Sequence, residues 1–238
     1  MVIVKGKSKM NRYLNWGDFV YTRKHLLSNF NSIYDDFMKR FHEFGKKLGI
    51  SSENTQTIGN KLFDAMASDR RTYHSPLHIL AMFDFAKLHN ISIELWEENA
   101  IWFHDAIYEF EKGEFSNEVN SAFFMKNLMR TYLTSSDLER SIEAIHETEK
   151  HLLENTNPDY NKIMDLDLCS FANPDVYKAT ARLLREEFST STDEQFEKDR
   201  RFFIGTLKGK GFIYRSQFFK DNFENIAMEN INRTLGIN

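Results

Sequence analysis

The stretch Leu95–Tyr108 reads LWEENAIWFHDAIY, and it decides the expected fold class of this 238-residue chain. Its apolar residues recur at helical spacing, and the pair His104-Asp105 stands in their midst. An ionised carboxylate is costly to bury unless a positive group compensates it. The stretch therefore predicts a buried helix with a polar pair that needs a partner. The partner is either a metal ion that the imidazole also binds, or an arginine in an ordinary core.

Helical spacing of apolar residues continues on both sides of this stretch. Helices are expected over residues 30–48, 53–68, 76–88, 95–108, 117–133, 136–153, 174–188, 193–207 and 219–235. Helix-start signals support this division, because Ser, Thr and Asn bind free backbone N–H groups of a first turn and Pro fits its first position. These signals are Ser75-Pro76, Asn173-Pro174, Thr192 with Gln195, and Ser136 with Glu139. We find no strand pair, and we expect an all-α fold of about nine or ten helices.

Composition and charge exclude several classes of protein. The hydrophobic content of 41% and the 22 Phe residues supply a sizeable core, and the net charge of −4 argues against bulk binding of nucleic acid. No apolar run is long enough for a membrane span or for the core of a signal peptide, so we expect a cytoplasmic protein without membrane contact. Cys169 is the one cysteine, beside eight histidines. Any metal site must therefore use His, Asp and Glu.

Two further segments carry candidate ligands. His74 and His78 flank the predicted start of a helix, where the positive end of the helix dipole keeps the His78 imidazole neutral, as metal binding requires. The alternative is a polar pair on the surface. Asp165 and Asp167 alternate with apolar residues, and side chains two positions apart do not share a helix face. One of them is therefore expected to point inward as a further ligand, and we favour Asp167.

The ordered set His78, His104-Asp105 and Asp167 resembles the HD-domain superfamily of metal-dependent phosphohydrolases. The resemblance covers about residues 60–235 and looks closest to a bacterial branch of predicted phosphohydrolases. That branch has the motifs Tyr-His-x-x-x-His, Trp-Phe-His-Asp-Ala, Asp-x-Asp-Leu, Asn-Glu and Thr-x-x-His. They stand here at residues 73–78, 102–106, 165–168, 117–118 and 148–151. The resemblance implies one HD-type helical domain over 1–238, with a motif-bearing core at about 60–190, N- and C-terminal helical extensions, and the helices of 191–238 packed on the core.

The resemblance also implies what the site residues do. The metal ligands would be His78, His104, Asp105 and Asp167, a set of donors that suits Mg, Mn, Fe, Co, Ni or Zn. Asp105 would in addition orient the nucleophile. The entry motif is similar to that of cyclic-nucleotide phosphodiesterases, in which the first His is the general acid; that residue is His74 here. Whether one metal or two bind stays open.

Positive groups near the motifs are candidates for binding a substrate phosphate. They are Arg71, Lys150, His151 and Arg185, and an ordinary surface charge is the alternative for each cation. His151 is preferred to His146 because it matches the family position, although a solvated histidine near a helix end is the alternative. The histidines that match no motif are His25, His42 and His89. An aromatic cluster, Phe202-Phe203 with Phe212, Tyr214 and Phe218-Phe219, is expected in the core, with a base-stacking wall as the alternative.

We therefore expect a metal-dependent phosphohydrolase that acts on a small phosphorylated compound such as a nucleotide. Two alternatives remain. One is an HD-type di-iron oxygenase, which needs further histidine ligands such as His146 and His151. The other is a metal- or nucleotide-binding module without turnover.

Overall fold

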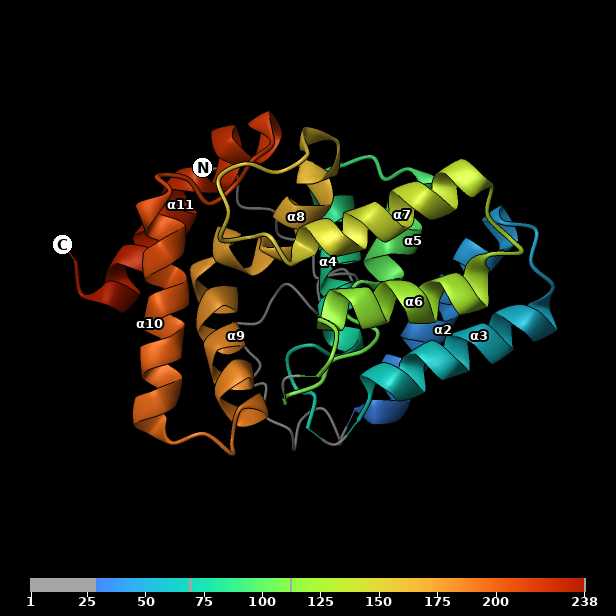
Figure 1. The fold of residues 1–238 in the computed structure, drawn as a ribbon, viewed down its shortest axis with the longest axis horizontal. Coiled ribbons are helices and arrows are strands. Elements are labelled where there is room, and N and C mark those ends of the chain that lie inside the picture. The colour runs from blue at the N-terminus through green and yellow to red at the C-terminus, as the bar shows by residue number, and fades with distance from the viewer. Residues whose placement is uncertain (1–28, 69, 112, 238) are drawn as a thin grey trace, which may run out of the picture.

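Ten α-helices and no strand make up the part of the chain that the computed structural model describes, namely residues 29–68, 70–111 and 113–237 (Figure 1). The helices are α2 (Phe30–Lys47), α3 (Ser52–Met66), α4 (Pro76–Leu88), α5 (Leu95–Phe103), α6 (Asn117–Met129), α7 (Ser135–Thr148), α8 (Asn161–Asp167), α9 (Pro174–Glu187), α10 (Asp193–Gly209) and α11 (Gln217–Leu235). Two short 3₁₀ helices, η3 (Pro158–Tyr160) and η4 (Cys169–Ala172), flank α8. The prediction of an all-α fold with about nine or ten helices is confirmed for these residues.

Aromatic side chains of α2 bury helix α5. Phe37, Phe41 and Phe44 are spaced by four and three residues, so they share one helix face, and all three are fully buried. Trp102 of α5 packs among them, with ring centroids 4.9 Å from Phe37 and 5.1 Å from Phe41 in edge-on geometry. Each such pair contributes about 0.5–1.5 kcal/mol beyond the area buried. This packing fixes the position of the C-terminal end of α5, which is followed directly by His104.

Helix ends differ from the expected ones at two places that bear on the site. Helix α5 ends at Phe103 rather than near residue 108, so His104 is its C-cap and Asp105 lies in the turn that follows. In that turn the Arg71 side chain takes the place of helical backbone donors, because it donates to the Asp105 and Ala106 carbonyls. The helix therefore ends where buried carbonyl groups bind Arg71 instead of backbone N–H groups. The spacing of apolar residues does not predict such an end.

Helix α7 also differs from its prediction, at both ends. It begins at Ser135 with Thr134 as its cap, whose side chain accepts from the backbone of Asp137, and it ends at Thr148 rather than 153. The Ser136–Glu139 capping box is thus wrong by two residues. The helix starts expected at Ser75-Pro76, Asn173-Pro174 and Thr192 are confirmed.

The helices form two ends and a middle (Figure 1). Helices α2 and α3 lie at one end, α9 to α11 at the other, and α4 to α8 between them. Helix α11 packs on η4, α9 and α10. Buried Asp165 of α8 joins this end to the middle by accepting from the backbone N–H groups of Arg215 and Ser216, both at 2.8 Å, ahead of α11.

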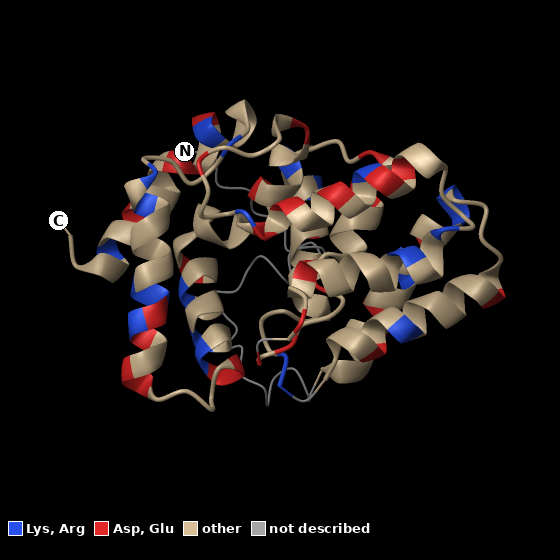
Figure 2. Cartoon of the chain, in the orientation of Figure 1, with Lys and Arg blue, Asp and Glu red and all other residues tan. Residues whose placement is uncertain are grey.

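Charged residues of both signs are interspersed along α10 in Figure 2. Among the helices that the structure describes, none combines the length and the apolar character that crossing a bilayer requires. The aromatic cluster of residues 202–219 divides: Tyr214 and Phe219 are buried as expected, whereas Phe202 is 69% exposed.

Candidate metal and catalytic site

Four predicted ligands meet where α4, α5 and α8 come together. His78 lies in the first turn of α4, His104 and Asp105 follow α5, and Asp167 ends α8. The Nε2 atom of His78 lies 2.8 Å from Asp167 Oδ1, 3.3 Å from His104 Nε2 and 3.8 Å from Asp105 Oδ2. The Nε2 atom of His104 lies 3.2 Å from Asp105 Oδ2 and 3.6 Å from Asp167 Oδ1. We call these four residues the His–Asp cluster.

The donor atoms of this cluster fit a divalent cation. Ligand atoms about 2.0–2.2 Å from a metal lie about 3–3.5 Å from one another, close to the separations found here. His78, His104 and Asp105 each offer a ligand atom within 4.8 Å of the other two. Asp105 Oδ2 is buried and its ion-pair contacts are to His78 and His104, so it faces the same position as the two imidazoles. The Nδ1 atom of His104 lies 3.0 Å from the Ile101 carbonyl, which directs Nε2 to the cluster centre.

The electrostatics of the cluster favour a positive charge at its centre. Burial lowers the pKa of His104, but the carboxylates of Asp105 and Asp167 outweigh it and raise this pKa well above its ordinary value. Burial likewise raises the pKa of Asp105, but His104 outweighs it, so the net shift is downward. A proton and a metal ion compete for such a site, because imidazole must be neutral to bind the metal.

The structure distinguishes the two aspartates of α8. Both oxygens of Asp165 are taken by Arg215 and Ser216, so this carboxylate faces the C-terminal helices. Asp167 faces the cluster instead, and its Oδ2 lies 2.7 Å from Nε2 of His151. His151 lies beyond the end of α7, in a loop whose carbonyls accept from Lys210 and Arg215.

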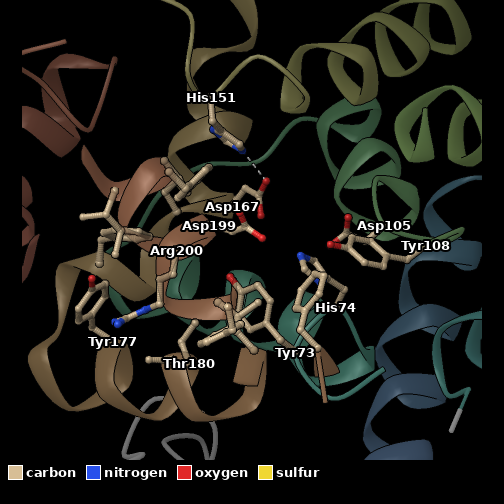
Figure 3. A pocket seen from close by; sticks show the side chains of 18 of the residues that line it. Tyr73, His74, Asp105, Tyr108, His151, Asp167, Tyr177, Thr180, Asp199 and Arg200 are labelled. Atoms are coloured by element: carbon tan, nitrogen blue, oxygen red, sulfur yellow. Dashed lines mark hydrogen bonds and ion pairs between the residues drawn. The ribbon is translucent and has the colours of Figure 1, made fainter. Parts of the chain in front are cut away.

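His74 forms a second polar group beside the cluster. Its Nδ1 atom is paired with the Glu187 carboxylate of α9, which is fully buried. The second oxygen of Glu187 accepts the backbone N–H groups of residues 72–74, at 2.7–3.0 Å. The ring of His74 stacks on Tyr108 with centroids 3.9 Å apart. Glu187 thus orients His74, and its ring points toward the space between Asp105 and Asp167 (Figure 3).

The charge of Glu187 also changes how His74 titrates. Burial lowers the pKa of His74, but the Glu187 and Asp105 carboxylates outweigh it, and the pKa lies above its ordinary value of 6.5. The pKa of Glu187, which burial raises, is lowered overall by His74 and by the backbone N–H groups. The raised pKa favours the protonated imidazole, which is the form that can donate a proton.

A cavity of about 380 Å³ connects these groups to the C-terminal helices. His74, Asp105, His151 and Asp167 are among its lining residues. The opposite side, which we call the α9–α10 wall, is formed by Tyr177, Thr180, Ala181, Leu184, Phe196, Asp199, Arg200, Phe203 and Ile204. In Figure 3, Tyr177, Thr180 and Arg200 lie across the cavity from Asp105 and Tyr108.

Of the four residues predicted to bind substrate, His151 alone lines this cavity. Arg71 is 4% exposed and donates to the carbonyls of residues 65, 74, 105 and 106, so it holds the two motif loops together. Lys150 pairs with Glu147, and Arg185 pairs with Asp193. None of these three residues is among the described residues that line the cavity, and their contact with a substrate stays a prediction.

Sequence reasoning missed Glu187, Tyr108, Thr180 and Arg200. None of them belongs to a motif, and Glu187 is 113 residues from His74 in the chain. Arg200 is the one lysine or arginine among the described residues that line the cavity, yet along α10 it stands among many other charges.

The histidines that matched no motif lie elsewhere. His42 contacts Gln56 at 3.0 Å, and His89 packs against Phe85 and Phe223. His25 lies outside the described residues. His146 is half-buried on α7 and does not line the cavity.

No protein-family model, curated protein or solved structure matches this chain.

Proposed function

We propose that this protein is a metal-dependent phosphohydrolase that cleaves a small phosphorylated compound. The observation that carries the proposal is that two groups face one cavity: the His–Asp cluster, through Asp105 and Asp167, and His74, which Glu187 orients. Hydrolysis of a phosphate ester needs both groups: positive charge on the phosphoryl oxygens, and an acid for the leaving oxygen.

His78, His104, Asp105 and Asp167 would hold the divalent cation. When bound, the cation supplies charge for a phosphoryl oxygen and lowers the pKa of a water molecule. Asp105 is placed for a second task, because it both belongs to the cluster and lines the cavity. Its carboxylate would orient the attacking water toward phosphorus.

His74 would protonate the leaving oxygen. Its Nδ1–H is held by Glu187, which leaves Nε2–H as the proton that faces the cavity. Glu187 stabilises the charged imidazole before the proton is transferred, and Tyr108 restrains the ring by stacking on it. His151 would add a hydrogen-bond donor beside Asp167, at the edge of the phosphate position.

The experiment measures metal content and hydrolysis together. The purified chain would be reconstituted with Mn²⁺, Co²⁺, Ni²⁺, Fe²⁺ or Zn²⁺ and assayed on a panel of phosphomonoesters and phosphodiesters. We expect stoichiometric metal and phosphate release that chelation removes and metal restores. Stoichiometric metal with no phosphate release from any ester would refute the proposal.

The same samples test the two alternatives from the sequence. A di-iron oxygenase needs more histidine ligands, and of His146 and His151 only the latter reaches the cluster. Two irons per chain with consumption of oxygen would establish that activity. Tight nucleotide binding without product would establish a binding module.

A further inference from the structure

We propose that the α9–α10 wall is a subsite for an uncharged ring, so that the preferred substrate is a phosphomonoester of a ring-bearing, largely apolar alcohol. The inference rests on the proposed function for its phosphate end. The ring subsite itself rests on the character of the wall alone.

The wall comes from α9 and α10, which follow the motif segments in the chain, and most of its side chains are apolar or aromatic. Its apolar contributors are Ala181, Leu184, Phe196, Phe203 and Ile204, and Phe188, the cap residue after α9, also lines the cavity. Phe188 and Phe196 also contact each other, with ring centroids 6.4 Å apart. Small-molecule sites of this volume are mostly apolar, and aromatic side chains pack edge-on or offset against a bound ring.

Hydrogen-bonding groups on the wall are few. The hydroxyl of Tyr177 is engaged by Thr234 at 3.0 Å. Thr180 is 5% exposed, and its Oγ1 is buried without a hydrogen-bond partner among the described residues. The remaining polar side chains of the wall are Asp199 and Arg200 and the rest of its surface is apolar, which does not suit a sugar with many hydroxyl groups.

The charges of the residues that line the cavity limit the number of phosphoryl groups that a substrate can carry. Arg200 is the one lysine or arginine among the described lining residues, and Glu197 lies 3.7 Å from its guanidinium. Asp199 and Glu118 add negative charge to the lining. A single phosphoryl group would be compensated by a cation held at the His–Asp cluster, whereas a second or third would meet one partly neutralised arginine. The cavity therefore favours a monophosphate over a diphosphate or triphosphate.

The test compares three probes on the full chain loaded with Mn²⁺: methyl phosphate, 1-naphthyl phosphate and ATP. Calorimetry gives each dissociation constant, and phosphate release is measured in the same samples. We expect 1-naphthyl phosphate to bind at least about tenfold more tightly than methyl phosphate, because the wall buries its ring. It should also bind more tightly than ATP.

Variants locate the preference on the wall. Ala181→Phe fills the subsite and should bring the affinity ratio of 1-naphthyl to methyl phosphate close to one. Arg182→Phe places the same side chain on an exposed neighbouring position of α9 and should leave the ratio unchanged. Leu184→Asn replaces Ala181→Phe if the latter fails to fold by circular dichroism, with the same loss expected.

The outcomes separate this inference from the proposed function. Equal affinities for the two monoesters, tighter binding of ATP, or a ratio that Ala181→Phe leaves intact would overturn the ring subsite, even if every ester were hydrolysed. A ring preference that depends on Ala181 without hydrolysis of any ester would support the subsite and refute the phosphohydrolase.

Discussion

The two sides of the cavity are built on different principles. The His–Asp cluster consists of polar groups that contact one another at 2.8–3.8 Å, from three helices of the buried middle of the molecule. The α9–α10 wall consists mainly of apolar side chains with one cation, Arg200. Chemistry requires donors held within fractions of an ångström, which a packed core supplies. Recognition of an apolar ring requires only shape and exclusion of water, which two helices packed on that core supply.

The largest effect is expected from the cluster, and it is tested by comparing Asp105 with Asp165, an aspartate whose carboxylate faces away from the cluster. Asp105→Asn removes one charged ligand and the group that orients water, so turnover should fall by at least about 10³-fold, with loss of bound metal. Asp165→Asn is the matched control. It weakens the hydrogen bonds to Arg215 and Ser216 and should lower the free energy of unfolding by about 1–3 kcal/mol while metal is retained. Metal analysis, kinetics and urea unfolding measure the three quantities. Loss of metal in both variants would show that the cluster and the helix junction are not separate.

The next effect separates the acid from the cluster. His74→Asn should retain metal but lower kcat by about 10²–10⁴-fold on methyl phosphate, whose leaving oxygen needs a proton. On 4-nitrophenyl phosphate, whose leaving group departs without protonation, the loss should be much smaller. Steady-state rates on both esters measure this difference. Equal losses on the two esters would assign His74 to substrate positioning rather than to acid catalysis.

A pH profile tests whether Glu187 acts through His74. The pKa of His74 is raised in the fold, against burial, by Glu187 and Asp105. Activity on methyl phosphate should therefore fall as pH rises through this raised pKa, because the protonated acid is lost. Glu187→Gln removes one of the raising charges, so the fall should move to lower pH. Profiles of kcat between about pH 5 and 9 measure the shift. A profile that moves to higher pH, or not at all, would contradict the pairing.

The smallest effect is expected from two arginines near the wall. Arg200 lines the cavity, so Arg200→Gln should raise KM for 1-naphthyl phosphate by about two- to tenfold, in the range of a partly exposed charge interaction. Arg185 pairs with Asp193 and is not among the lining residues, so Arg185→Gln should leave KM unchanged. The comparison of the two variants shows which arginine near the wall contacts the substrate. A larger rise in KM for Arg185→Gln than for Arg200→Gln would identify Arg185 as a substrate ligand.

The sequence predicted best those features that depend on residues close together in the chain. Helical spacing and caps depend on residues three or four positions apart, and the all-α class and most helix starts followed from them. The exceptions are instructive: α5 ends at Phe103 because Arg71, far away in the chain, binds the carbonyls beyond it. A local pattern contains no information about such a partner.

The sequence by itself determined the helical class and, through one cysteine among eight histidines, that a metal site would use nitrogen and oxygen ligands. Only the tertiary structure decided that Arg215 and Ser216 engage Asp165, that Glu187 orients His74, and that Arg200 instead of Arg71 lines the cavity. The physical reason is that the partner of a buried charge is chosen by packing between distant segments. The residue type shows that a partner is needed, and the fold decides which one it is.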